Sequence, residues 1–248
     1  MSEKLRILSL NMSGCTDIAF FHAYISQIRP DIVALQNTAH IFSVTPAAKL
    51  AQQVTASVVN SGASHTMALM SWKVPLKQVQ EYDLGGGSNC MVADVTLGKQ
   101  RFLFFNVRLR GSFFQRPGQI KKLLSPELLG RYDMLLPAVI AGDFYDTLWV
   151  SGHPQFQSRL QRISPIFLRA TYPACCPFIS RDRFYTIGGI QVEQIRIDSS
   201  AQIRKKLTHL PLILDMHVHT RGTAIWTEVK ARDKLDRVLS SSSIFKCN

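Results

Sequence analysis

The first 36 residues follow a strand, helix, strand pattern, and this order constrains the fold more than any other feature of the chain. Residues 5–10 form an aliphatic run typical of a buried strand. Apolar side chains then recur at helical spacing over residues 18–28, with Thr16 as the expected N-cap, until Pro30 ends the helix. A second strand over residues 31–36 follows at once. This order predicts a βαβ unit whose two strands lie in one sheet.

Most of the remaining chain consists of short strand-like runs separated by turns rich in Gly, Pro or Lys. Helices are expected over residues 116–132, 153–162 and 226–239. Strands are expected over residues 54–59, 66–72, 90–97, 101–107, 137–143, 184–187, 190–197 and 212–220. Many strands with few helices predict an α/β domain, a two-layer β-sandwich flanked by helices. We place this domain at residues 1–222 and a C-terminal helical extension at residues 223–248.

The charge of the chain bears on its partners. Lys and Arg number 29 against 17 Asp and Glu, a net charge of +12. Such an excess attracts polyanions, so nucleic acid, an acidic protein and an anionic membrane surface all fit, as does a basic surface that is merely solvated. No apolar run of 18 residues occurs and the start leaves no room for a signal peptide, so we expect no transmembrane segment and a cytoplasmic location. Five cysteines without CxxC spacing predict reduced thiols.

Short segments in a fixed order carry a resemblance to a known family. They are LSLN at residues 8–11, PDIVALQ at 30–36, AGDF at 141–144, DRFY at 182–185 and THLP at 208–211. In this order they resemble motifs of the endonuclease/exonuclease/phosphatase superfamily, which includes pancreatic deoxyribonuclease and the apurinic endonucleases. Each motif alone is weak, and the ordered set is specific. The resemblance implies the deoxyribonuclease-like fold, in four layers α/β/β/α.

The resemblance also implies a role for each matching position. In this family carboxylates hold a divalent cation, usually magnesium, while a histidine paired with an aspartate manages protons. Asn11 matches the active-site asparagine, and Asp143 matches the aspartate of the family's GDFN turn. Asp182 and His209 match the aspartate and histidine pair. We take these four as residual catalytic positions.

Four departures from the family pattern change what the site can do. Asn37 stands where the metal-binding glutamate is expected, and Thr208 where the second metal-binding aspartate is expected. Because both are neutral, a hard cation would be held poorly. Tyr145 replaces the asparagine of GDFN, and Arg108 replaces the histidine of an NTHL-like segment. We expect Arg108 and Tyr145 to be the phosphate-binding positions, and we expect no resident metal.

The retained residues also admit a structural interpretation. Asp182 and His209 can be a surviving acid and base pair, or an inherited structural hydrogen bond that fixes two adjacent strands. Asp143 can be a metal ligand, or a turn residue that accepts hydrogen bonds from exposed backbone donors.

Two patterns outside the motifs are ambiguous as well. Asp215, His217 and His219 alternate along one predicted strand and so share a face, which suits either a displaced metal site or the solvated side of a half-buried strand. Basic residues at 204–206 precede the THLP motif, and can bind a polyanion or form an exposed loop.

The leading hypothesis is therefore a catalytically inactive member of the fold that serves as a binding or assembly module for a protein complex or nucleic acid. The alternative is a divergent phosphoesterase or nuclease with a rewired site that uses Asn11, Asp143, Asp182 and His209 and requires Mg²⁺. No cofactor is expected under the leading hypothesis. Metal dependence separates the two.

Overall fold

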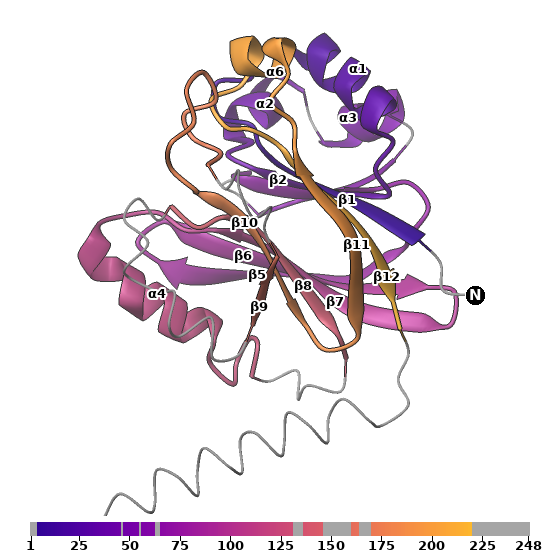
Figure 1. Ribbon diagram of the computed structural model, residues 1–248, viewed down its shortest axis with the longest axis vertical. Helices are drawn as coiled ribbons and strands as arrows, with labels where there is room; N and C mark the ends of the chain where they lie inside the picture. Colours follow the sequence, from indigo (N-terminus) through magenta and orange to yellow (C-terminus); the bar gives the residue numbers. More distant parts are fainter. Residues whose placement is uncertain are drawn as a thin grey trace, which may run out of the picture.

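The computed structural model describes residues 4–45, 47–54, 56–62, 65–130, 136–145, 160–163 and 170–219, and within them two six-stranded sheets pack face to face (Figure 1). In the first sheet the strands lie in the order β11 (Ile190–Ile197), β12 (Leu212–Val218), β1 (Lys4–Asn11), β2 (Ile32–Gln36), β4 (Met67–Ser71) and β3 (Ser57–Asn60). In the second the order is β5 (Leu76–Gly85), β6 (Ser88–Leu97), β7 (Gln100–Arg108), β8 (Ala138–Asp143), β10 (Asp182–Ile187) and β9 (Gln161–Ile163).

Helices cover the outer face of each sheet. The first sheet carries α1 (Ile18–Ile28), α2 (Ala39–Val44), α3 (Ala47–Val54) and α6 (Ala201–Lys206), and the second carries α4 (Arg116–Leu123), which follows the 3-10 turn η1 (Phe113–Gln115) (Figure 1). One apolar cluster fills the space between the sheets, and two others lie between a sheet and its helices. The molecule therefore has the four layers α/β/β/α that the sequence predicts.

The predicted βαβ opening is confirmed, because β1 and β2 are parallel neighbours with α1 between them in the chain. The expected N-cap of α1 is wrong. Asp17, not Thr16, caps the helix, since its carboxylate accepts a hydrogen bond from the Phe20 amide at 2.9 Å.

Several other boundaries differ from the predictions. The helix predicted over residues 116–132 ends at Leu123, where Ser125 and Pro126 follow and the chain turns. The strand predicted from residue 54 begins only at Ser57, since Val54 ends α3. Residues 161–162, predicted as the end of a helix, belong to β9.

Other elements were unexpected or lie beyond the description. The helices α2 and α3 and the strand β5 had no counterpart among the predictions. The helix predicted over residues 226–239, and with it the proposed extension at 223–248, falls outside the described residues, as do residues 153–159. The domain boundary at residue 222 thus stays a prediction. No described helix is both long and apolar enough to cross a membrane.

Strand register positions the residues that the motifs single out. In the parallel pair β1 and β2, Asn11 lies opposite Gln36, the residue before Asn37. In the second sheet Arg108, at the end of β7, lies opposite Asp143 at the end of β8. Asp143 also lies opposite Asp182, the first residue of the antiparallel strand β10. Motifs far apart in the chain therefore meet at one edge of the sandwich.

Candidate functional site

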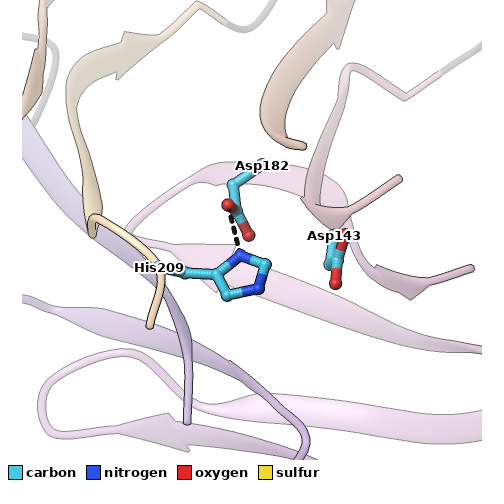
Figure 2. Close-up of side chains that lie close together, drawn as sticks. All are labelled: Asp143, Asp182 and His209. Atoms are coloured by element: carbon cyan, nitrogen blue, oxygen red, sulfur yellow. Dashed lines mark hydrogen bonds and ion pairs between the residues drawn. The ribbon is translucent and has the colours of Figure 1, made fainter. Parts of the chain in front are cut away.

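Asp143, Asp182 and His209 form a buried cluster at this edge (Figure 2). One potential ligand atom from each lies within 4.8 Å of the other two. His209 Nδ1 lies 2.8 Å from Asp182 Oδ2, and because a carboxylate can only accept, the imidazole donates this hydrogen bond. Asn11 joins the cluster, since its Nδ2 donates to Asp143 Oδ2 at 2.9 Å and lies 3.4 Å from His209 Nε2. The four residual catalytic positions are thus brought together.

Arg181 is a residue of the candidate site that the sequence did not predict. Its Nη2 donates to Asp143 Oδ2 at 3.1 Å, in an ion pair whose two side chains are 11% and 2% exposed. The guanidinium carbon lies 4.1 Å from the ring centroid of Tyr145 and 4.7 Å from that of Tyr172. The Tyr172 ring lies 4.8 Å from the His209 ring. A cation held between two aromatic rings therefore neutralises the Asp143 carboxylate.

The position of the family's metal-binding glutamate has a different environment. The Asn37 side-chain oxygen accepts hydrogen bonds from Arg108 Nε at 2.8 Å and from Arg110 Nη2. Its amide nitrogen donates to Asn11 Oδ1 at 2.9 Å. Arg108 also donates from Nη1 to the Gly87 carbonyl at 3.0 Å. Two guanidinium groups thus surround the place where the family pattern has a carboxylate.

Thr208 and Tyr145 stand at the other two positions that depart from the family pattern. Thr208 Oγ1 donates to the Ser13 carbonyl at 2.7 Å, so it ties the histidine segment to the loop after β1. Tyr145 has a positive φ of 48°, and its amide donates to Asp143 Oδ1 at 2.8 Å. The residue is 38% exposed, and the Arg181 guanidinium lies over its ring. The predicted phosphate-binding role of Arg108 and Tyr145 stays a prediction.

Burial and neighbouring charge set the protonation of the cluster. Burial raises the pKa of Asp143, and the nearby Asp182 charge raises it further, while Arg181 and His209 oppose the shift. Burial alone would lower the pKa of His209, but the charge and hydrogen bond of Asp182 outweigh it and leave it raised. Burial, with repulsion from Arg110, lowers the pKa of Arg108 to about 10, so the group remains cationic at neutral pH.

The residues of this cluster do not fit a magnesium ion as they are arranged. Mg²⁺ requires near-octahedral oxygen ligands. Asp143 already accepts hydrogen bonds from Asn11, Arg181 and the Tyr145 amide, and Asp182 Oδ2 is bonded to His209. Only Asp182 Oδ1 is buried with no partner among the described residues. One open carboxylate oxygen beside a guanidinium is a poor ligand set for a divalent cation.

The patterns outside the motifs have structural roles. Asp215 pairs with Arg6 at 2.7 Å, and His217 lies 3.7 Å from Glu193. Within the described part of the chain, the grouping of potential metal ligands consists of Asp143, Asp182 and His209, so the alternation along β12 does not make a metal site. The basic segment at 204–206 lies in and at the end of α6, where Lys206 pairs with Asp17 at 3.0 Å.

The position of Arg181 could be recognised only once the register of β8 and β10 was known. The residue directly precedes Asp182, and its carbonyl accepts from the Phe144 amide at 2.9 Å, which continues the β8 and β10 pairing by one step. Arg181, the residue before Asp182, is therefore held against Phe144, the residue after Asp143. Arg110 and Tyr172 lie in loops and had no comparable signal.

Comparisons with known proteins agree with the fold. A sequence profile described as the endonuclease/exonuclease/phosphatase family matches residues 8–247. Similar solved structures include a humanized D. rerio TDP2, with TM-score 0.70 and 16% identity, where 86% of this chain and 98% of that one are covered. The human Nocturnin catalytic domain with bound sulfate has TM-score 0.68 and 13% identity, with 87% and 94% covered.

A third similar structure is a mannosyl-6-phosphatase from Bacteroides thetaiotaomicron, with TM-score 0.67 and 14% identity, where 86% of this chain and 99% of that one are covered. A search of curated protein sequences found no match. At these identities the structural likeness establishes the fold, and the activities of the three proteins remain their own.

Proposed function

Because the chain belongs to the endonuclease/exonuclease/phosphatase family, we propose that it is a member that binds the phosphate groups of single-stranded nucleic acid at the family site without metal and without hydrolysis. One observation carries this proposal: the side-chain oxygen of Asn37 accepts hydrogen bonds from Arg108 and Arg110. Where the family pattern has a carboxylate that would hold a cation, this protein has an amide held by two cations.

The charge of these groups suits an anion. Arg108 is buried and largely occupied by Asn37 and Gly87, so it fixes the local field and is not the main contact. Arg110 is exposed, and a guanidinium with free donors binds phosphate through paired hydrogen bonds. Arg181 also donates to Asp143, the carboxylate that Asn11 contacts, and that ion pair neutralises its charge. A phosphate arriving at this edge therefore meets the exposed Arg110 guanidinium beside Asn37.

Exposed aromatic side chains near the site favour nucleic acid over a protein partner. Phe113 and Phe114 are 51% and 89% exposed. In the sequence they stand between Arg110, which contacts Asn37, and Arg116, whose guanidinium carbon lies 5.3 Å from the Tyr145 ring centroid. Phe178 is 72% exposed, and its amide donates to the carbonyl of Tyr172 at 3.1 Å. Aromatic rings beside cations are the usual platform on which unpaired bases stack.

A second candidate, a metal-dependent phosphoesterase, is favoured by the cluster of Asp143, Asp182 and His209. In that case the Asp182 carboxylate orients the imidazole, and His209 Nε2 is the atom that exchanges a proton with the substrate. Arg181 would first have to leave Asp143, because it occupies that carboxylate. This requirement makes the second candidate the weaker of the two.

The proposal is tested by binding of a fluorescein-labelled deoxythymidine 20-mer, followed by fluorescence anisotropy at low salt in the presence of EDTA. We expect saturable binding that magnesium does not strengthen. Arg110→Ala is expected to weaken it about tenfold or more, since charge-assisted contacts contribute about 1.5–3 kcal/mol. Lys77→Ala, which removes one exposed cation from β5, is the matched control and should change little.

The second candidate is tested in parallel by hydrolysis of plasmid DNA and of a generic phosphodiester with magnesium or manganese. Turnover that requires metal and disappears in His209→Ala would replace the proposal with the phosphoesterase. Absence of oligonucleotide binding, or binding unchanged by Arg110→Ala, would remove the nucleic-acid role even if no turnover is found.

A further inference from the structure

A cavity lies at the opposite end of β2 from the candidate site. Its volume is about 560 Å³, within the range of small-molecule sites. It is lined by residues of α1 and α3, which cover the same face of the first sheet (Figure 1), by Pro30 and Asp31 before β2, and by Trp72 and Lys73 after β4. Since Asn37 follows β2, the strand separates the two places by roughly 17 Å. Of the residues in the family motifs, Pro30 and Asp31 alone line this cavity.

The wall of this cavity includes an aromatic plate. Trp72 is partly buried and packs against the apolar cluster between the first sheet and its helices. Its backbone amide donates to the Asp31 carbonyl at 3.3 Å, so the residue is held at the end of β4. Ile25 of α1 adds an apolar surface. An indole fixed by its backbone and by core packing can stack on a planar ring with little further loss of side-chain entropy.

The rim of the cavity is cationic. Arg29 ends α1 with a positive φ of 51°, and within the described residues its guanidinium makes no hydrogen bond or ion pair. The Lys73 side chain is 83% exposed, with Nζ 3.9 Å from Asp31 Oδ1. The other oxygen of Asp31 accepts from the Arg6 amide at 2.8 Å. Arg29 and Lys73 carry two positive charges and Asp31 carries one negative charge, so the rim has a net positive charge.

We infer that this cavity binds a nucleoside monophosphate. The base stacks on Trp72, and the phosphate lies between Arg29 and Lys73. A planar ring joined to an anion matches an aromatic plate beside cations, whereas neither a bare anion nor an uncharged ring uses both features. The residues are distinct from those around Asn37, so this site and the nucleic-acid site stand or fall separately.

The test is calorimetric titration of adenosine 5′-monophosphate into the whole protein at low salt, with adenosine and inorganic phosphate as the two partial probes. We expect saturable binding of the monophosphate, and at least tenfold weaker binding of either partial probe. Arg29→Ala, an exposed position, is expected to weaken the monophosphate at least tenfold. Lys77→Ala is the matched loss of charge elsewhere and should leave the affinity unchanged.

Substitution of Trp72 separates stacking from packing. Trp72→Phe keeps a ring and should retain most of the affinity, whereas Trp72→Leu should lose at least tenfold with the fold intact by circular dichroism. A DNA hexamer with a 5′-phosphate that competes tenfold more tightly would identify a chain end as the occupant, and weaker competition would identify the free nucleotide. Either result supports the site.

Three results would overturn the inference. One is no saturable binding of the monophosphate to the wild-type protein. The second is equal affinity in wild type, Arg29→Ala and Trp72→Leu. The third is loss of binding in Arg110→Ala with no loss in Arg29→Ala, which would move the nucleotide to the family site.

Discussion

At the ends of β8 and β10 the site keeps two carboxylates and, with His209, an imidazole, whereas at the ends of β1, β2 and β7 it presents amides and guanidiniums. In the first half every retained group is buried and hydrogen-bonded to another retained group or to Arg181. In the second half the cation-binding position has become an acceptor for two arginines. Within one site, therefore, one half holds its carboxylates in a closed hydrogen-bonded network, while the other half presents cations where the family pattern has a metal ligand.

The largest expected effect concerns the half that keeps its carboxylates. Asp182→Ala leaves His209 buried without its partner, and breaking a buried pair costs about 3–5 kcal/mol of the free energy of unfolding. Urea denaturation measures this loss. Glu193→Ala, which breaks an exposed pair with Lys4, is the control and should cost at most about 1 kcal/mol. A loss for Asp182→Ala no larger than the control would show that this half is not structural.

The next effect sharpens the comparison at the cationic half. Phe114 is 89% exposed, so Phe114→Ala should leave stability within about 0.5 kcal/mol of wild type. If bases stack on it, affinity for the deoxythymidine 20-mer should fall by about 1–3 kcal/mol. Val44→Ala, at an exposed apolar position on α2, is the matched control for anisotropy titrations. Unchanged affinity in Phe114→Ala would move any nucleic acid away from this loop.

A smaller effect is expected at Asn37, which has a positive φ of 57°. Asn37→Ala loses the hydrogen bonds to Arg108 and Asn11 and adds backbone strain of about 1–2 kcal/mol, while Asn37→Gly loses the same bonds without the strain. Thermal and urea denaturation should therefore rank wild type above Asn37→Gly and Asn37→Gly above Asn37→Ala. Equal stability of all three would mean that the amide does not organise the arginines.

The smallest effect is the dependence of stability on pH. His209 has a raised pKa in the folded protein, so its contribution is fully present below the ordinary histidine pKa of about 6.5 and is lost as pH rises through the raised value. The free energy of unfolding should fall with rising pH in this window, and His209→Gln should flatten the curve. His219→Gln, at an exposed histidine, should not. A wild-type curve that rises there would contradict the assigned direction.

Much of the fold followed from local patterns in the sequence. The strand at residues 5–10 and the helix at 18–28 were recognisable because their apolar spacing matches the period of each element. The strand β5 was missed because one of its faces is open to solvent at the edge of the sheet, so few apolar residues mark it. The helices α2 and α3 are short, and such helices depend on packing more than on propensity.

The site was predictable only as far as its motifs. Asn11, Asp143, Asp182 and His209 were found because the resemblance supplied their order, and strand register then brought them together. Arg181 was missed because it contacts Asp143 and Tyr145, which are distant in the chain. These contacts also depend on the strand pairing that continues past Asp182. Arg110 was missed because a loop has no period from which its direction can be read.

The central proposal for this site is that arginine stands in place of the metal. Calorimetric titration of magnesium into the wild-type protein, beside Asp143→Asn, tests it most directly. We predict no saturable heat for either protein at millimolar magnesium, because Arg181 holds Asp143 and two guanidiniums hold Asn37. Saturable binding to wild type that disappears in Asp143→Asn would contradict the account and make the cluster of Asp143, Asp182 and His209 a metal site.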